Sequence, residues 1–269
     1  MGVRGLHVVE RGAGAPGPLV VLVHGSLDRG ASFARVATAE ALADLHTIRY
    51  DRRGYGRSVD AGPPAGLDEH VDDLLAVVDG RPAVVVGHSF GGLVALVAAT
   101  RAPDEVRAVA AFEPPQPWLP WWPGTSAGSA AARVDAADAG EAFFRRMVGD
   151  ARWEALPERT RQARRREGTA LAAELASVRT AATPPFDPAG LAVPVLLGRG
   201  TRSPAHLRRS AEELAAAVPG SQLVAVAGAD HGAHLTHPAE VARWVRTAVD
   251  LVRGERSALG GDDADRVSG

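Results

Sequence analysis

The chain contains no cysteine and no lysine, and these two absences narrow its chemistry. Without cysteine, the protein has no disulfide, no thiolate ligand for zinc or an iron–sulfur cluster, and no cysteine nucleophile. Without lysine, a P-loop lysine, a lysine Schiff base and a lysine general base are excluded. The nucleophiles that remain are Ser, Thr, Asp, Glu, Tyr, His and activated water.

The sequence also lacks a long apolar run and an excess of charge of either sign. No stretch approaches ~20 consecutive apolar residues, and the N-terminal residues have no long apolar region of the kind found in signal peptides. Thirty basic and 32 acidic residues give a formal net charge of −2, which does not favour binding of nucleic acid through its phosphates. We expect a soluble, cytoplasmic protein whose partner is neither a membrane nor a nucleic acid.

The 269 residues alternate between short apolar, β-branched runs and helical stretches. This alternation predicts an α/β fold with a mostly parallel sheet that helices cover on both faces. The expected strands are 18–23, 46–50, 82–87, 106–112, 193–197 and 222–226, with an antiparallel edge strand at 6–10. The expected helices are 32–45, 68–79, 90–101 and 205–218, and a final helix begins at Pro238.

Residues 114–188 interrupt the alternation over a length far beyond that of an ordinary loop. They begin with a Pro- and Trp-rich segment and continue as Arg- and Ala-rich helical sequence. We interpret them as a helical cap at the carboxyl ends of the strands, where open α/β sheets bind ligands. The core domain would then comprise 1–113 and 189–253, and 254–269 is expected to be a disordered tail.

The sequence Gly-His-Ser-Phe-Gly-Gly at 87–92 stands between an expected buried strand and a helix of small residues. In a G-x-S-x-G pattern the glycines permit a sharp strand-to-helix turn that presents the serine hydroxyl outside the sheet. The helix N-terminus then favours the negative charge that develops during acyl transfer. This context predicts Ser89 as a nucleophile, and the alternative is a tight turn with an incidental serine.

A second loop, His24-Gly25-Ser26-Leu27, follows the first central strand. An oxyanion hole in this setting needs an amide from that loop as well as the amide after the nucleophile. We therefore expect the N–H of Ser26, or failing that of Leu27, to pair with the N–H of Phe90.

These segments, together with the Asp-Arg-Arg-Gly-Tyr-Gly-Arg-Ser loop at 51–58, resemble the α/β-hydrolase superfamily in type and order. The resemblance covers 18–113 and 190–250, and it implies an eight-stranded, mostly parallel sheet with a lid inserted after the sixth strand. The dehalogenase and epoxide-hydrolase branches share this layout but use an aspartate nucleophile, so Ser89 argues against them. Asp51 and Arg52 are expected to fix the loop beside the pocket.

Three histidines, His231, His234 and His237, compete for the role of general base after the last strand. The resemblance selects His231, because the family usually places its catalytic histidine seven residues before the proline that begins the final helix. His237 would then lie at the cap of that helix, and His234 would line the pocket or be exposed. The H-x-x-H-x-x-H spacing suggests metal binding as an alternative, but no acid or cysteine ligand pattern accompanies it, so we expect neither a metal nor a cofactor.

The acid of the triad is where the chain departs from the family pattern. The segment Val193–Gly200 ordinarily leads to an aspartate where this chain has Ser203, and a serine cannot stabilise an imidazolium electrostatically. Glu113 is the best replacement, because some branches of the fold carry the acid after the strand that follows the elbow. The alternative for Glu113 is an exposed hinge residue at the cap entrance.

Three aspartates rank below Glu113 as the acid. Asp230 is adjacent to His231 in sequence and would have difficulty reaching its ring, and Asp51 and Asp187 are less suitable still.

The sequence thus predicts a cofactor-independent, esterase-like serine hydrolase. It would cleave an ester, lactone or thioester of a small, largely apolar molecule through an acyl-enzyme on Ser89. One alternative is a non-hydrolytic enzyme of the same fold: a C–C bond lyase, a perhydrolase or a cyclase. The other is a ligand-binding or signalling protein with a residual hydrolase site. The oligomeric state, monomer or homodimer, stays open.

Two features of the inserted segment have two interpretations each. Trp118, Trp121 and Trp122 either line the substrate cleft or only pack within a Pro-rich hinge. The arginine run at 164–166 is expected to be a solvated helix face rather than an anion site.

Overall fold

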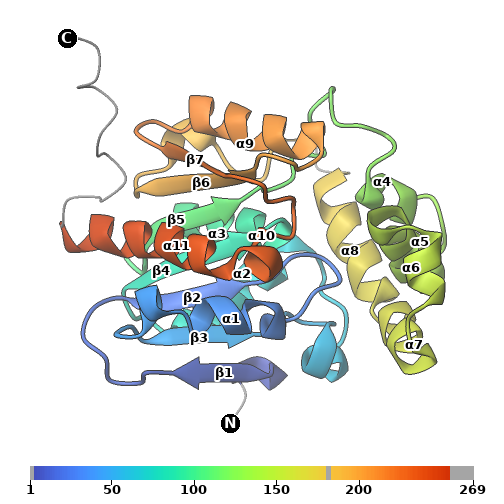
Figure 1. Cartoon of the computed structure of the whole chain (residues 1–269), viewed down its shortest axis with the longest axis horizontal. Coiled ribbons are helices and arrows are strands. Elements are labelled where there is room, and N and C mark those ends of the chain that lie inside the picture. The colour runs from blue at the N-terminus through green and yellow to red at the C-terminus, as the bar shows by residue number, and fades with distance from the viewer. Residues whose placement is uncertain (1–2, 180–182, 255–269) are drawn as a thin grey trace.

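The computed structural model describes residues 3–179 and 183–254, and within them seven strands form a single sheet in the order β1-β3-β2-β4-β5-β6-β7 (Figure 1). Every neighbouring pair is parallel except β1 with β3. The strands are β1 Val8–Arg11, β2 Leu19–Val23, β3 Thr47–Tyr50, β4 Ala83–His88, β5 Val106–Phe112, β6 Val195–Gly200 and β7 Gln222–Val226.

The expectation of an eighth strand is wrong for the described part of the chain. Only one strand precedes β2, because Val3–Gly5 form a 3₁₀ turn and Leu6 then enters the core.

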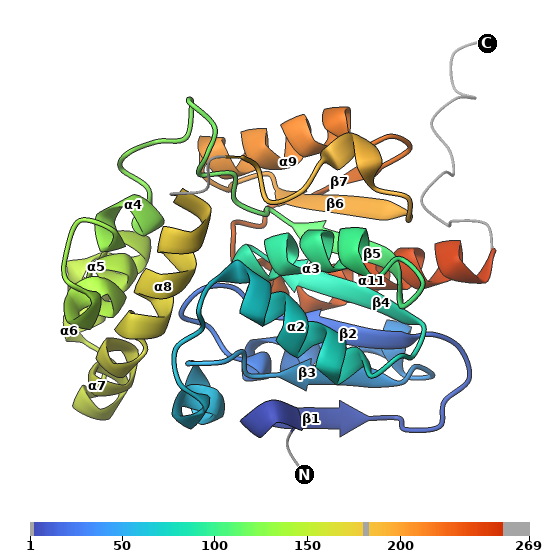
Figure 2. The ribbon, with the colours of Figure 1, turned by 180° about the vertical axis from the view of Figure 1, so that it is seen from behind.

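Helices cover the sheet on both faces, and each face has its own apolar core. On one face lie α2 (Leu67–Val78), α3 (Phe90–Arg101) and α9 (Ala205–Ala217), which Figure 2 shows nearest the viewer. On the other lie α1 (Ala34–Ala37) and α11 (Pro238–Arg253). Alternate residues of β2 supply the two cores, with Val21 and Val23 in the first and Val20 and Leu22 in the second, as a central strand with both faces covered requires.

The expected helix over 32–45 is wrong as a single element. The chain instead forms a 3₁₀ turn at Gly30–Phe33, the short helix α1, and a second 3₁₀ turn at Glu40–Leu42. Thr38 ends α1, and its hydroxyl donates to the carbonyl of Ala34 at 2.9 Å, which gives the backbone a local alternative to a longer helix. Ala39 is extended, so the chain changes direction there.

In its described residues, the segment expected to be helical contains five helices, and they lie together beside the sheet in both views (Figures 1 and 2). They are α4 (Ala127–Ala131), α5 (Ala136–Val148), α6 (Asp150–Glu154), α7 (Glu158–Arg166) and α8 (Gly168–Arg179). Ion pairs from α8 and the residue before it reach loops that follow β2 and β3, so this layer lies over the carboxyl ends of those strands. We call these five helices the α4–α8 layer.

The remaining expected elements agree with the structure to within three residues at each end. The 3₁₀ turns at Gly56–Ala61 and Pro188–Gly190 and the short helix α10 (Ala233–Thr236) complete the description. No helix among residues 3–179 and 183–254 is long and apolar enough to cross a membrane. The tail expected to be disordered lies outside the described residues from 255 onward.

Candidate active site

Ser89 occupies a sharp turn between β4 and α3. Its backbone has φ 53° and ψ −123°, a region that non-glycine residues rarely adopt. A Cβ on Gly87 would lie 2.2 Å from the carbonyl oxygen of Gly91, so the turn closes only because residue 87 has no side chain. The Ser89 amide donates to the carbonyl of Phe112 at 2.8 Å, which ties the turn to the neighbouring strand.

The loop with the second expected oxyanion amide lies directly against this turn. A Cβ on Gly91 would lie 2.3 Å from the carbonyl oxygen of Val23, and a Cβ on Gly25 would lie 3.0 Å from Cβ of Ser89. The structure therefore brings Ser26, which follows Gly25, next to the turn that carries Phe90. Phe90 is the first residue of α3, and the first amides of a helix have no partner within it.

Glu113 and His231 meet although 118 residues separate them in sequence. The Nδ1 atom of His231 lies 2.6 Å from Oε2 of Glu113, and Oε1 of Glu113 accepts a hydrogen bond from the amide of Gly200 at 2.8 Å. The Glu113 side chain is 0% exposed and that of His231 is 14% exposed. The interpretation of Glu113 as an exposed hinge residue is therefore wrong.

Ser203, at the position where the family usually has an aspartate, lies close to this pair. Its hydroxyl is buried and has no hydrogen-bond partner, and it would lie 2.7 Å from a Cβ placed on Gly200. Asp230 bonds instead to the amide of Gly232, and Asp187 to that of Ala189. Of the acids considered from the sequence, only Glu113 contacts the ring of His231.

Three of the described non-glycine residues with positive φ lie at this end of the sheet: Leu27 at 51°, Ser89 at 53° and Glu113 at 47°. Each follows a different central strand, and each is a residue that the sequence placed in the site. Such conformations cost about 1–3 kcal/mol each and persist where the surroundings enforce them, which is common at functional sites.

Asp51 fixes the loop after β3, as expected. Its two carboxylate oxygens accept hydrogen bonds from the amides of Gly30 and Arg57, each at 2.8 Å. Arg52 also holds this region, because its Nε donates to the carbonyl of His24 at 2.9 Å.

His24 connects the loops after β2 and β3. Its Nδ1 donates to the carbonyl of Gly25 at 2.7 Å, and its Nε2 accepts from the amide of Arg52 at 2.8 Å. These two bonds require the neutral ring with the proton on Nδ1. Burial first, and then the positive charge of Arg52, lower the pKa of His24 to about 4.

A buried charge cluster that the sequence did not suggest joins the α4–α8 layer to the core. Glu174 of α8 accepts from Nη1 of Arg52 at 2.8 Å and from the hydroxyl of Ser26, and its Oε2 lies 3.3 Å from Nε2 of His70. The side chains of Arg52, His70 and Glu174 are all 0% exposed. Helical periodicity marks Glu174 only as a charged residue among apolar ones, and its partners come from three other parts of the chain.

The arginine run also differs from expectation at one position. Arg164 is mostly buried, and its Nη1 donates to the carbonyl of Leu27 at 2.6 Å and to Glu167 at 3.0 Å. Arg166 is exposed, as expected. Arg164 therefore links the α4–α8 layer to the loop that carries Ser26.

Two of the three tryptophans contact α9. Nε1 of Trp121 donates to Glu213 at 2.8 Å, and the ring of Trp122 lies edge-on to His206 at 5.0 Å between centroids. Trp118 packs against the apolar core on the α2, α3 and α9 face of the sheet. Burial and the neighbouring His231 lower the pKa of His206. His206 is thus a polar group near the site that sequence analysis missed, and a substrate-binding role for the tryptophans stays a prediction.

The three competing histidines have different surroundings. His231 contacts Glu113, Nε2 of His234 lies 3.3 Å from Oδ2 of Asp28, and Nδ1 of His237 lies 2.8 Å from the hydroxyl of Thr236. His88, in the elbow, was not considered from the sequence. Its Nε2 donates to the carbonyl of His231 at 2.7 Å, and burial lowers its pKa well below the usual value.

Comparison with known proteins identifies the family. A model of the alpha/beta hydrolase family matches residues 20–244. The chain belongs to the alpha/beta hydrolase family. Among curated relatives of this α/β-hydrolase, Lipase LipV of Mycobacterium tuberculosis is 38% identical over 112 residues, which cover 40% of this chain and 41% of the lipase. The epoxide hydrolase of Caballeronia sordidicola is 38% identical over 118 residues, which cover 41% of this chain and 34% of that enzyme.

Each of these alignments spans well under half of the curated relative, so the relationship supports the family and leaves activity to be argued from the site. A solved structure, the enol-lactonase from Burkholderia xenovorans LB400, superimposes on this α/β-hydrolase with a TM-score of 0.68. The match covers 89% of this chain and 94% of the lactonase at 23% sequence identity, which shows a common fold.

Proposed function

We propose that this α/β-hydrolase is a serine hydrolase that cleaves an ester, lactone or thioester of a small, largely apolar molecule. The observation that carries the proposal is the contact between the buried carboxylate of Glu113 and Nδ1 of His231, beside a serine in a nucleophile elbow. A buried carboxylate in this position selects the ring tautomer with its proton on Nδ1 and stabilises the charged ring. The same arrangement leaves Nε2 free to accept a proton.

The proposed reaction has two steps. Ser89 Oγ attacks the substrate carbonyl while His231 Nε2 takes its proton, and the amides of Phe90 and Ser26 stabilise the oxyanion. The intermediate collapses when His231 gives the proton to the leaving oxygen or sulfur as its bond to the acyl carbon breaks. An alcohol or thiol departs, or in a lactone the alcohol stays attached to the acyl group, and the acyl-enzyme remains on Ser89. Water then attacks the acyl group by the same route and regenerates the Ser89 hydroxyl.

We further propose that the α4–α8 layer acts as a lid over Ser89 and that its entrance selects the substrate. The support is its position over the carboxyl ends of the strands and its contacts with the loop at 24–27 through Glu174 and Arg164. The division of the chain into a core and a cap, and a cytoplasmic location, stay predictions from the sequence.

The test uses a fluorophosphonate probe and a set of p-nitrophenyl esters. We expect the wild-type chain to be labelled and to turn over a short or medium acyl ester. Ser89→Ala should lose both labelling and turnover while its far-UV circular dichroism is unchanged, and His231→Ala should lose nearly as much. His237→Ala is the matched control, because His237 contacts Thr236 rather than Glu113, and it should keep most of the rate.

Other results would redirect the proposal. A wild-type chain that is neither labelled nor active on any ester or lactone would favour the ligand-binding alternative. A chain that is labelled at Ser89 but releases no acid from esters, lactones or thioesters would favour a lyase, perhydrolase or cyclase.

A further inference from the structure

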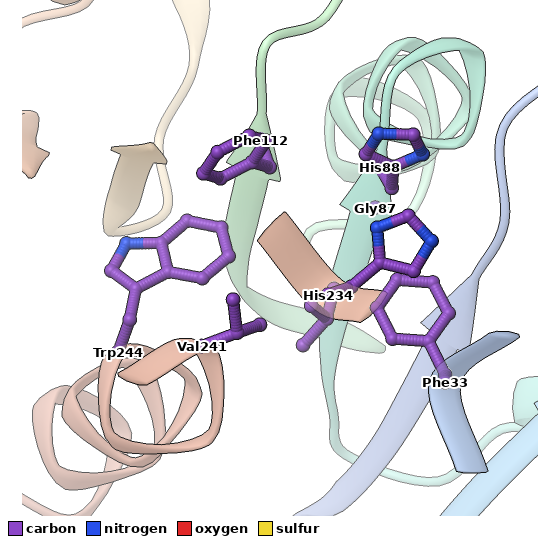
Figure 3. Close-up of a pocket in the computed structure, with 8 residues that line it drawn as sticks. Phe33, Gly87, His88, Phe112, His234, Val241 and Trp244 are labelled. Carbon is purple, nitrogen blue, oxygen red and sulfur yellow. The ribbon is translucent and has the colours of Figure 1, made fainter. Parts of the chain in front are cut away.

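Three side chains of types that can bind a metal ion lie together beside the proposed active site, and none of them takes part in the proposed reaction. They are Asp28, His88 and His234, and one ligand atom from each lies within 4.8 Å of the others. Figure 3 shows the rings of His88 and His234 next to one another, and their centroids are 4.2 Å apart. The spacing is compact enough for one small ion to contact all three after modest side-chain movement.

The separation between two of the ligand atoms already matches that of a metal site. Oδ2 of Asp28 lies 3.3 Å from Nε2 of His234. Two ligands in tetrahedral geometry with metal bonds of about 2.0–2.1 Å are about 3.3 Å apart, since the edge of a tetrahedron is about 1.6 times its radius. A hydrogen bond between an imidazole and a carboxylate is normally shorter than this distance.

His88 is oriented as a metal-binding histidine is. Its Nε2–H donates to the backbone carbonyl of His231 at 2.7 Å, which leaves a lone pair on Nδ1. Nδ1 is buried and has no hydrogen-bond partner. Metal-ligating histidines usually donate their other ring N–H to a carbonyl or carboxylate in this manner, because that bond fixes the tautomer and the ring orientation.

The surroundings differ on the two sides of the cluster. A small cavity of about 10 Å³, lined by apolar groups that include Phe33, Phe112 and Trp244, borders the two histidine rings. Asp28 does not line that cavity, and its side chain is 25% exposed. An ion would therefore enter past Asp28, where a water can complete the coordination.

We propose that Asp28, His88 and His234 bind one first-row divalent transition ion, with Zn²⁺ as the test ion. Two imidazoles and one carboxylate are a donor set that suits such ions, and the fourth position is left to water. The three ligands come from different segments: Asp28 lies two residues after Ser26, His88 ends β4 just before Ser89, and His234 lies in α10, three residues after His231. The ion would crosslink the three segments that carry the proposed oxyanion hole, nucleophile and base.

The spacing of the histidines pointed to a different ligand set. The H-x-x-H-x-x-H pattern groups His231, His234 and His237, but only His234 belongs to the cluster. Its two partners come from positions 28 and 88, so no local motif reveals them.

Metal binding to the full chain tests the proposal, and the readouts do not depend on catalysis. After treatment with EDTA and dialysis, we expect calorimetric titration with ZnCl₂ to give one equivalent, and CoCl₂ to produce the visible absorption bands of four-coordinate Co²⁺. At about a hundredfold excess over Kd, bound Zn²⁺ should raise Tm by about 5 °C or more, because it binds only the folded state.

Variants locate the ion. Asp28→Asn and His234→Ala should each weaken Zn²⁺ binding by about a hundredfold or more and abolish the Tm shift. Asp28→Asn keeps the shape of the side chain, so it tests the ligand even if His234→Ala is poorly folded. His237→Ala is the control and should bind Zn²⁺ as the wild type does.

Two outcomes would overturn the proposal. One is a wild-type chain that takes up neither Zn²⁺ nor Co²⁺. The other is uptake that survives in Asp28→Asn and His234→Ala but is lost in His231→Ala, which would place the ion on the proposed general base instead. Neither outcome bears on whether Ser89 is a nucleophile, so failure here is distinguishable from failure of the proposed function.

Discussion

Two glutamates, Glu113 and Glu174, both have side chains that are 0% exposed, but they contact different kinds of basic group. Glu113 follows β5 and contacts the ring of His231, which is partly exposed. Glu174 lies on α8 and contacts the guanidinium of Arg52, which is fully buried. An imidazole gives up and takes back a proton near neutral pH, whereas a guanidinium stays charged. The first pair is suited to proton transfer and the second to a permanent link.

The electrostatics of Glu174 support this contrast. Burial acts to raise its pKa, but Arg52, then His70 and the Ser26 hydroxyl outweigh burial and lower the pKa to about 2. The carboxylate is thus charged throughout the neutral range. A fully buried ion pair does not guarantee stability, but removal of one partner leaves an uncompensated buried charge.

The largest expected effect comes from the Glu113 side of the comparison. Glu113→Gln keeps the shape of the side chain but loses the charge that stabilises the protonated ring of His231. We expect kcat on a p-nitrophenyl ester to fall by ~10⁴ with little change in the unfolding free energy. Glu174→Gln measured alongside should retain far more of its kcat. A Glu113→Gln enzyme near the wild-type rate would show that another acid or a two-residue mechanism operates.

The second prediction concerns the contribution of the buried Glu174–Arg52 ion pair to stability. Glu174→Gln leaves the buried guanidinium of Arg52 without its counter-charge, so we expect the free energy of unfolding in urea to fall by about 3–5 kcal/mol. Glu240→Gln is a matched control, because Glu240 forms an exposed pair with Arg243 and should change stability by less than about 1 kcal/mol. Equal losses in the two variants would contradict the assignment of Glu174 as a structural link.

A smaller effect should come from returning an acid to the position that the family usually uses. In the Glu113→Gln background, Ser203→Asp would place a carboxylate where a buried hydroxyl now has no partner. We expect kcat to recover by at least about tenfold, equivalent to about 1.4 kcal/mol in the barrier. Ser203→Asn in the same background has the same shape without the charge and should give no recovery.

The smallest effect concerns the loops around Arg52. The folded-state pKa of His24, about 4, lies below the ordinary value of 6.5, so between these pH values the unfolded chain binds the additional proton. The stability that neutral His24 contributes is therefore present above pH 6.5 and is lost as the pH falls toward 4. The free energy of unfolding of the wild type should rise with pH between pH 5 and 6.5. We expect His24→Gln to reduce this slope by about 1 kcal/mol per pH unit.

His70 and His88 add slopes of the same sign, because burial lowers the pKa of both. The variant should therefore flatten the wild-type profile in part. Urea midpoints measured at pH 7, 6 and 5 provide the comparison, and parallel profiles for the two chains would contradict a buried neutral His24.

The sequence by itself determined the elements whose causes are local. The strand before Ser89, the glycines around it and the small-residue helix Phe90–Arg101 are encoded within some twenty consecutive residues, and the structure has them where the pattern predicts. The strand Val106–Phe112 and the helix start at Pro238 were equally local. Two expectations failed: the eight strands, which were implied by the resemblance, and the single helix over 32–45, where a local hydrogen bond from Thr38 to Ala34 accompanies the end of α1.

Only the tertiary structure decided which polar groups meet. The contact of Glu113 with His231 was predicted through a resemblance, and its geometry depends on the crossovers that set β5, β6 and β7 side by side. The partners Arg52 and Glu174 are 122 residues apart, and Asp28 and His234 are 206 apart. The hydrophobic periodicity of a sequence predicts which face of a helix or strand is buried, but it does not predict which other element packs against that face. A buried charge is paired by whatever the fold places beside it, and this is a property of the whole chain.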